Sequence, residues 1–145
     1  MIKRYGEGPK QGQTYKLRHG AYAVLPRRGQ LLVTWQGGAY NEVQLPGGGI
    51  DPGESPIAAL HREVFEETGW HIAAPRRLGV MRRFVQMPED GKFYEKICHI
   101  YVATPTLRMG PPTEEEHDAL WMSPAQAIRV LANDGDAAFV ASLLG

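Results

Sequence analysis

The sequence predicts an α+β fold in which a mixed β-sheet packs against helices, and two observations point to this class. Runs rich in Val, Leu, Tyr and Trp alternate with turns that contain glycine and proline, which is typical of strands. Ser55-Pro56 and Ser123-Pro124 each place a capping hydroxyl before a proline suited to the first turn of a helix. The order strands, helix, strands, helix indicates a layered domain.

The first half of the chain begins with a polar segment. Residues 1–13 contain glycine and proline and few apolar residues, so we expect a loose N-terminal leader. Residues 20–36 predict a hairpin whose turn lies at residues 26–30. A loop at residues 37–42 and a short strand at 43–46 then lead into a run of glycines.

The second half predicts a helix, a long hairpin and two more helices. The helix covers residues 55–68, and Gly69 is well placed to end it. The hairpin joins residues 76–88 to residues 92–105. The remaining segments are a loop at 106–119, a helix over roughly 124–132 and a short helix at 136–144. Together, residues 1–145 form one domain of a size that can bury one core.

Composition argues against several classes of protein. Lys plus Arg and Asp plus Glu both number 16, so the net charge gives no global reason to expect nucleic-acid or membrane binding. Cys98 is the only cysteine, which excludes an internal disulfide and a multi-cysteine zinc site. Neither a signal peptide nor an apolar run of membrane-spanning length is visible. We therefore expect a soluble, cytoplasmic protein.

The helix at residues 55–68 carries an unusual acidic face. Ile57, Leu60 and Val64, extended by Phe65, form its apolar stripe. The neighbouring face presents three carboxylates close together, with Arg62 beside them: Glu63, Glu66 and Glu67. Like charges at this spacing repel one another, and the negative end of the helix dipole, at the C-terminus, disfavours carboxylates. A solvated acidic face is one interpretation; a bound divalent cation, which prefers oxygen ligands, is the other.

Residues 48–70 resemble the signature of the Nudix hydrolases. The matching residues are Gly48, Glu54, Arg62-Glu63-Val64, Glu66-Glu67 and Gly69, whereas Trp70 stands where the family usually has an aliphatic residue. The resemblance implies a Nudix-type α/β/α sandwich with a mixed β-sheet between helices. It also implies hydrolysis of a pyrophosphate bond in a nucleoside diphosphate that is linked to another moiety.

The resemblance also implies roles for these residues. Glu63, Glu66 and Glu67 would bind Mg²⁺ or Mn²⁺, with the carbonyl of Gly47 or Gly48 as a further ligand. Arg62 would orient the glutamates and Glu54 would support the junction between loop and helix. The backbone of Gly48 and Gly49 could approach a ligand closely.

Outside the signature, the candidates are weaker. Glu116 is our choice for a late acidic metal ligand or general base, with Glu115 second and a solvated loop acid as the alternative. His117 is a further acid–base candidate, against a plain surface or capping histidine. Arg82 and Arg83 could meet substrate phosphates, as could Arg76 and Arg77, although paired arginines are often solvated.

The sequence leaves the substrate open. Nucleoside triphosphates, dinucleoside polyphosphates, ADP-ribose and nucleotide sugars all fit, and the balanced charge favours a small nucleotide over capped RNA. The alternative function is a catalytically silent Nudix-fold module that senses a nucleotide. The resemblance leaves both a monomer and a homodimer open.

Overall fold

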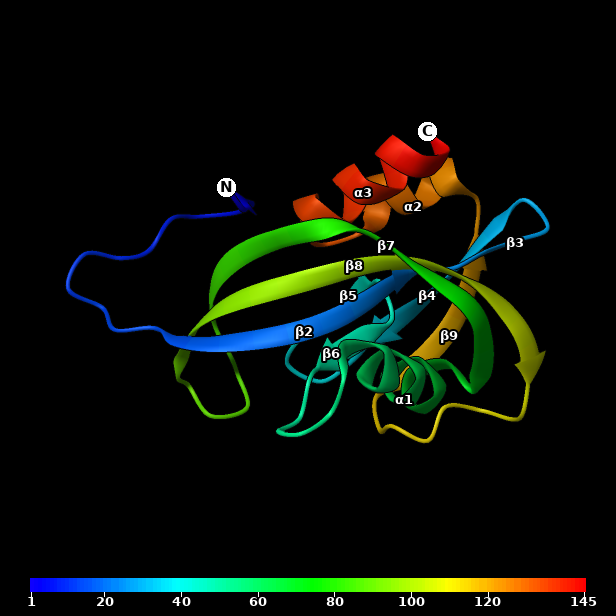
Figure 1. Ribbon diagram of the computed structural model, residues 1–145, viewed down its shortest axis with the longest axis horizontal. Helices are drawn as coiled ribbons and strands as arrows, with labels where there is room; N and C mark the ends of the chain where they lie inside the picture. The colour runs from blue at the N-terminus through cyan, green and yellow to red at the C-terminus, as the bar shows by residue number, and fades with distance from the viewer.

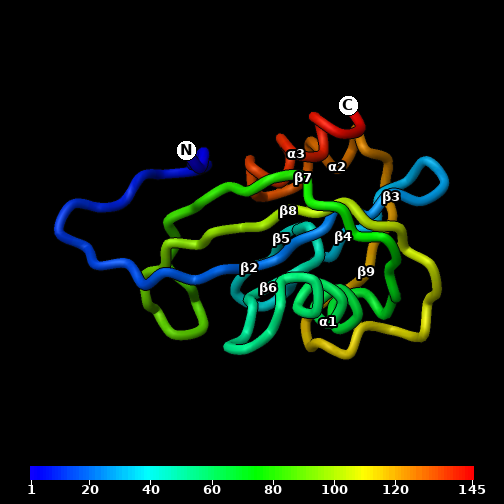
Figure 2. Tube along the Cα trace, in the orientation of Figure 1, coloured from blue at the N-terminus to red at the C-terminus, as the bar shows by residue number.

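The computed structural model describes all 145 residues, and Figure 2 traces the chain. The strands are β1 (Lys3–Arg4), β2 (Lys16–Val24), β3 (Pro26–Arg27), β4 (Gln30–Gln36), β5 (Glu42–Gln44), β6 (Gly47–Gly49), β7 (Trp70–Gln86), β8 (Phe93–Arg108) and β9 (His117–Met122). The helices are α1 (Pro56–Thr68), α2 (Pro124–Val130) and α3 (Asp134–Leu144).

The molecule has three layers. The strands lie between α1 on one side and the pair α2 and α3 on the other (Figure 1). One sheet has the order β1-β7-β8-β2-β6, and the second places β4 between β3 and β5, with β9 also paired to β4. Because parallel and antiparallel pairs both occur, the predicted α/β/α sandwich with a mixed sheet is confirmed.

The long predicted hairpin forms the two longest strands of the first sheet, β7 and β8. β7 and β8 pair antiparallel from Trp70–Arg108 to Gln86–Phe93, with bulges along the way. β2 pairs with the other edge of β8 in parallel. These three strands are long, and the sheet that they form extends well beyond the acidic helix α1 (Figure 1).

The hairpin predicted over residues 20–36 is wrong for most of its length. β2 does not pair with β4, because its two edges are taken by β8 and β6. The predicted turn is present: the chain turns at Arg28–Gly29, and this turn joins β3 to β4 in a short antiparallel hairpin in the second sheet. The glycines that follow β5 form a strand of their own, β6.

Two predicted loops contain strand residues. Lys3 and Arg4, expected in a loose leader, pair in parallel with β7, and Tyr5 packs against the core. The loop predicted at 106–119 is shorter, because β8 continues to Arg108 and β9 begins at His117. Both errors concern short segments whose strand partners are remote in sequence.

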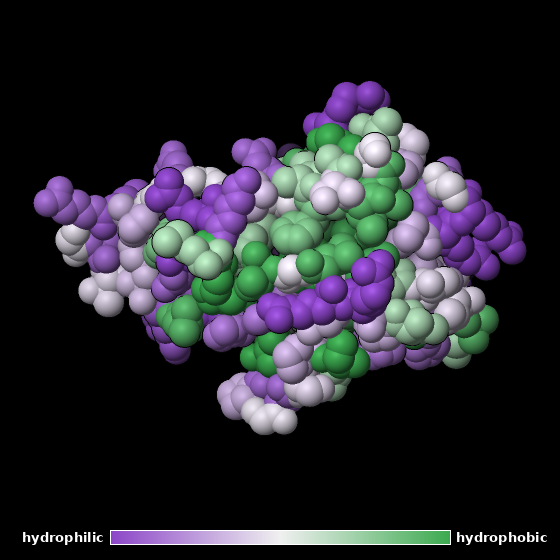
Figure 3. All heavy atoms as spheres, turned by 45° about the horizontal axis from the view of Figure 1, so that its top comes forward, coloured by the Kyte–Doolittle hydropathy of each residue, from purple (hydrophilic) through white to green (hydrophobic).

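Apolar side chains gather on both sides of the strands. One cluster includes Leu60 and Val64 of α1, and the other includes Val140 of α3. Ile57, expected in the apolar stripe of α1, is exposed. Figure 3 brings the α2–α3 layer forward and shows apolar surface over it, with polar surface at both ends of the molecule. None of the three helices has the length and apolar character needed to cross a membrane.

Candidate active site

Helix α1 begins and ends where its local sequence predicts. The Ser55 hydroxyl accepts a hydrogen bond of 3.1 Å from the Ala58 N–H, and Pro56 opens the first turn. Gly69 adopts a left-handed φ of 77° and donates its N–H to the Phe65 carbonyl at 2.8 Å. These two caps set the ends of the helix, and the packing of Leu60 and Val64 in the core leaves Glu63 and Glu67 facing the cavity beside strand β6.

Strand β6 brings glycine backbone directly against two of the glutamates. The Glu67 carboxylate accepts a hydrogen bond of 3.0 Å from the Gly47 N–H. A Cβ atom at Gly48 would lie 2.6 Å from the Glu63 carboxylate carbon, so a larger residue would push that side chain away. The close approach therefore depends on glycine, which leaves the backbone of β6 open to a ligand.

Arg62 joins the acidic residues into one network. Its guanidinium donates two hydrogen bonds to Glu54, at 2.8 and 2.9 Å, and one to Glu63 at 3.0 Å. A longer contact of 3.5 Å reaches Glu66, and another donor meets the Gly49 carbonyl at 3.2 Å. The paired hydrogen bonds from Arg62 lower the pKa of Glu54 to about 2. Arg62 thus holds the loop after β6 against the helix.

A cavity of about 290 Å³ opens beside these groups. Its lining includes Gly47, Gly48, Gly49, Glu63 and Glu67 from β6 and α1, Glu114 and His117 from the β8–β9 region, and Tyr22, Arg83, Lys96, Asn133 and Asp136 from the strands and the start of α3. Glu66 does not line the cavity and is held at its margin by Arg62. The cavity is polar, and its lining comes from both sheets and from helices on both sides.

The two glutamate side chains that face this cavity, Glu63 and Glu67, have raised pKa values. Burial raises the pKa of Glu67 well above its usual value, although the hydrogen bond from Gly47 opposes the shift. Burial also raises the pKa of Glu63 despite the nearby Arg62. Glu114 and Glu66 add repulsion to both. Such a group of mutually repelling oxygen donors has the chemistry that a hard divalent cation would stabilise.

In this structure, no three metal-ligating side chains converge closely enough to form a complete cluster. Mg²⁺ commonly takes only one or two carboxylates and completes its octahedron with waters and substrate phosphates. The pair Glu63 and Glu67 beside the Gly47 backbone therefore fits that cation without a full protein cage.

His117 is a buried member of the site. Its side chain shares a hydrogen bond of 2.9 Å with the Thr34 hydroxyl through Nδ1, and its Nε2 lies 3.7 Å from the Glu67 carboxylate. Burial lowers the pKa of His117 below its ordinary value. A neutral ring then packs against Glu67, so the histidine orients the carboxylate more than it neutralises it. The surface or capping alternative for His117 is wrong, because the residue is only 8% exposed.

The acidic loop residue that reaches the cavity is Glu114, and neither of the predicted residues, Glu116 and Glu115, does so. Glu116 does not line the cavity; its carboxylate lies against Gly38, and its own φ is 64°. Glu115 does not line the cavity either. The N–H groups of Thr113 and Glu114 both bind the Glu66 carbonyl at 2.9 Å, which docks this loop on the end of α1. Nothing local distinguishes three successive glutamates, so only the tertiary contact selects Glu114.

Of the four arginines proposed for phosphate contacts, the neighbours Arg82 and Arg83 point in different directions. Arg83 lines the cavity, whereas Arg82 does not. Neighbouring residues of a strand face opposite sides of a sheet, so both could not serve one site. Arg82 contacts Glu95 at 3.4 Å and lies over the Phe84 ring. Arg77 contacts His99 at 3.2 Å, and neither Arg76 nor Arg77 lines the cavity.

Asp136 gives a testable pH dependence. The side chain is 5% exposed, and burial raises its pKa from 3.8 to about 6, so the folded state prefers the protonated acid. Its contribution to stability is complete below pH 3.8 and is lost as pH rises through about 6. Asp136→Asn, which stays neutral, should gain about 2–3 kcal/mol over wild type between pH 4 and pH 7. Urea unfolding of both proteins at the two pH values checks this; a difference that does not change with pH would contradict it.

This chain resembles known proteins in sequence and in fold. The NUDIX domain family model matches residues 15–143. A putative 8-oxo-dGTP diphosphatase of Bacillus subtilis is 33% identical over 54% of this chain and 52% of its own length, so the matched segment spans about half of that relative. An isopentenyl-diphosphate Delta-isomerase of Streptomyces coelicolor is 29% identical over 87% of this chain and 68% of its own.

Solved structures show the same fold. A NUDIX hydrolase from Nitrosomonas europaea superimposes with a TM-score of 0.71 at 20% identity, covering 88% of both chains. A MutT protein from Bacillus halodurans gives a TM-score of 0.72 at 21% identity, covering 88% of this chain and 82% of its own. Because the family model spans nearly the whole chain, including the glycine strand, the acidic helix and the cavity between them, this protein belongs to the NUDIX domain family.

Proposed function

We propose that this protein is a metal-dependent pyrophosphohydrolase that cleaves a phosphoanhydride bond in a nucleoside diphosphate linked to another moiety. The observation that carries the proposal is the placement of Glu63 and Glu67 on one cavity with the glycine backbone of β6. Both carboxylates have raised pKa values and stand among further acids. This arrangement is costly unless a cation and a phosphorylated ligand use it.

Mg²⁺ or Mn²⁺ would be held by Glu63 and Glu67, which line the cavity, with the Gly47 carbonyl and Glu114 as additional oxygen donors. Glu66, which does not line the cavity, would join them only by turning from Arg62 toward it. When bound, such a cation would neutralise charge on phosphate oxygens and would lower the pKa of bound water. Arg62 keeps the glutamates in place through hydrogen bonds to Glu54 and Glu63. Arg83, on the cavity wall, is suited to a substrate phosphate, because a guanidinium binds oxyanions with paired donors.

Two relatives whose names describe cleavage of a pyrophosphate bond support this chemistry, whereas the isomerase does not. Besides the diphosphatase, an RNA pyrophosphohydrolase of Proteus mirabilis is 51% identical over 32% of this chain and 26% of its own length. That match is short, so it supports the chemistry of the shared segment more than an RNA substrate. We propose a small nucleotide as substrate and the cytoplasm as the compartment, in line with the balanced charge.

A panel of nucleotides tests this function. ADP-ribose, nucleotide sugars, dinucleoside polyphosphates and canonical and oxidised nucleoside triphosphates are each incubated with Mg²⁺, Mn²⁺ or EDTA, and phosphate release is measured through a coupling enzyme. Turnover that requires the cation and is lost in Glu67→Gln supports the proposal. Folded protein that binds a nucleotide by calorimetry without turnover would indicate the silent sensing module instead.

Glu114→Gln and Glu116→Gln form a matched pair for the acidic loop. Glu114 lines the cavity, whereas Glu116 lies outside it. We expect Glu114→Gln to lower kcat/KM by about 10–100-fold, the range seen when a group supporting a metal site is lost. Glu116→Gln should stay within about 2-fold of wild type. Initial rates at saturating metal, measured for both variants, distinguish the two positions; equal effects would contradict the assignment.

A further inference from the structure

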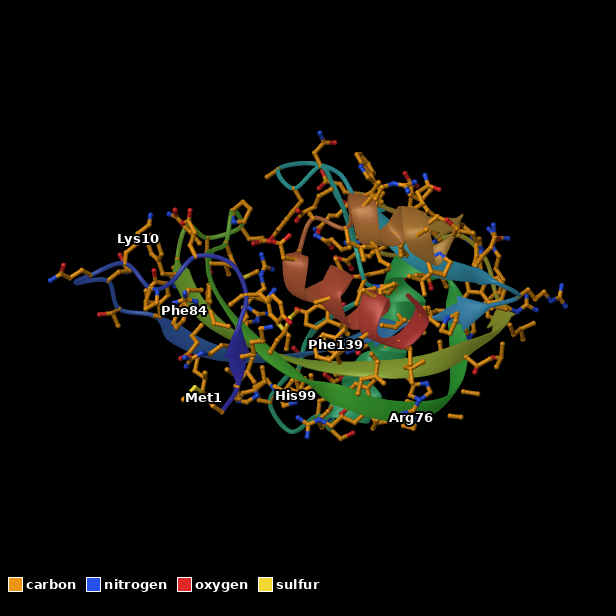
Figure 4. The ribbon with its side chains drawn as sticks, turned by 90° about the horizontal axis from the view of Figure 1, so that it is seen from above. Met1, Lys10, Arg76, Phe84, His99 and Phe139 are labelled. Carbon is orange, nitrogen blue, oxygen red and sulfur yellow. The ribbon has the colours of Figure 1, made fainter.

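The pairing of β4 with β9 places Thr34 beside His117. Because the two strands are antiparallel with Gln36 opposite His117, Thr34 is the diagonal neighbour of the histidine on the same side of the sheet. Val33 faces the other side, in the cluster against which Phe139 of α3 packs, and Figure 4 shows α3 and Phe139 on the side nearest the viewer. Successive side chains of a strand alternate, so Thr34 points away from α3 and toward the side of α1.

The buried hydroxyl of Thr34 sets the tautomer of His117. Thr34 is fully buried, and its hydroxyl shares a hydrogen bond of 2.9 Å with one partner, the His117 Nδ1 atom. If the ring donated this hydrogen bond, the hydroxyl hydrogen would be buried without an acceptor, which is costly. The hydroxyl therefore donates and Nδ1 accepts, so the neutral ring carries its proton on Nε2.

That proton faces Glu67, whose carboxylate is thereby approached from two sides. His117 Nε2 lies 3.7 Å from Oε2 of Glu67, and the Gly47 N–H donates to Oε1 at 3.0 Å. The first contact is too long for a hydrogen bond, but its electrostatic sign depends on the tautomer. A ring N–H attracts the carboxylate, whereas a ring nitrogen with a lone pair repels it. Because both side chains are buried, this difference is weakly screened by water.

We propose that Thr34 is a positioning residue for Glu67, and that it acts by holding His117 with its Nε2–H toward the carboxylate. The inference rests on the function proposed above, in which Glu67 is a ligand of the divalent cation. Thr34 does not line the cavity, so its influence on the cation passes through the histidine. Each oxygen of Glu67 then faces one donor and keeps a lone pair for the cation.

Nuclear magnetic resonance of the metal-free wild-type protein tests the tautomer directly. Ring nitrogens with and without a proton differ in ¹⁵N chemical shift, so spectra of protein labelled at histidine, recorded at pH 8, show which nitrogen of His117 carries the proton. The His117→Gln variant, which lacks this signal, assigns it among the five histidines. We expect the proton on Nε2. A proton on Nδ1 would overturn the inference without any variant of Thr34.

Thr34→Val and Thr34→Ser form a matched pair, because valine keeps the branched shape without the hydroxyl and serine keeps the hydroxyl. Electron paramagnetic resonance measures the Kd of Mn²⁺ for each variant in the absence of nucleotide. We expect Thr34→Val to raise this Kd by at least about 10-fold, the lower end of the effect of losing a group that supports a metal ligand. Thr34→Ser should stay within about 2-fold of wild type.

The same valine substitution in a Glu67→Gln background separates positioning from a general effect on the fold. There we expect Thr34→Val to change the Kd of Mn²⁺ by less than about 2-fold, because the carboxylate through which Thr34 acts is gone. A rise in Kd that is equal in the two backgrounds, or equal for valine and serine, would contradict the proposal.

The nucleotide panel described above distinguishes a failure of this inference from a failure of the proposed function. If the expected tautomer and Mn²⁺ affinities are found but no nucleotide is hydrolysed, the hydrolase proposal fails and the role of Thr34 stands. If nucleotides are hydrolysed but His117 carries its proton on Nδ1, the role of Thr34 fails alone. Wild-type protein that does not bind Mn²⁺ would overturn both.

Discussion

Glu67→Gln should lower turnover by about 10²–10³-fold and at the same time make the metal-free protein more stable. The loss of activity follows from the position of Glu67, which faces the cavity beside Glu63 and contacts the β6 backbone. Removing one preorganised group that stabilises charge in the transition state commonly lowers kcat by a factor of this size. An amide has the shape of the carboxylate but supplies less negative charge to a cation.

The gain in stability has a separate cause. Glu67 is 6% exposed, and burial together with neighbouring acids raises its pKa. A raised carboxyl pKa means that the contribution of Glu67 to stability is present at low pH and is lost as pH rises through the raised value. Glutamine avoids that loss, and its amide oxygen can still accept the Gly47 N–H. The stabilisation should therefore be larger at pH 8 than at pH 5.

Activity assays with Mg²⁺ measure the first effect, and thermal unfolding of the same preparations in EDTA measures the second. Glu115→Gln is the matched control, because it removes the same charge from an exposed position that does not line the cavity. We expect the control to keep its activity and its melting temperature. If the variant were both inactive and less stable than wild type, Glu67 would stabilise the folded protein. That result would falsify the interpretation that the buried Glu67 carboxylate lowers the stability of the metal-free protein.

Local signals predicted the helices of this protein well. The Ser-Pro pairs at the starts of α1 and α2 and Gly69 at the end of α1 act within one or two turns of chain, so their effect can be read without knowing the fold. The acidic face of α1 follows from the same helix. The core of the candidate site could therefore be proposed from the sequence.

The remaining parts of the site depend on contacts between remote segments. The partner of β2 is β8, about eighty residues later, and no local pattern favours that parallel pair over the hairpin expected at residues 20–36. The choice of Glu114 depends on how its loop docks on α1, and the burial of Asp136 depends on how α3 covers the strands. Arg82 and Arg83 look alike in the sequence, and only the side of the sheet that each faces separates them.

Gly47→Ala should destabilise the protein by about 3–5 kcal/mol, combining the strain of a backbone conformation that side chains rarely adopt with overpacking against fixed atoms. Gly47 has a φ of 148°, and a new Cβ would collide with the Ala21 carbonyl oxygen of β2. Because that oxygen belongs to the paired strand, the clash can be relieved only by moving β6 away from β2.

Gly48→Ala is the matched substitution one residue later, and its expected effect is different. The new Cβ would meet the Glu63 carboxylate, which is the far end of a flexible side chain. Glu63 can turn aside, so we expect a loss of stability below about 1 kcal/mol but a fall in kcat/KM of at least about 10-fold. Urea unfolding and initial rates for both variants test the contrast. Equal stability losses would mean that the two glycines serve only the packing of β6, and that the close approach of Glu63 to the backbone has no part in catalysis.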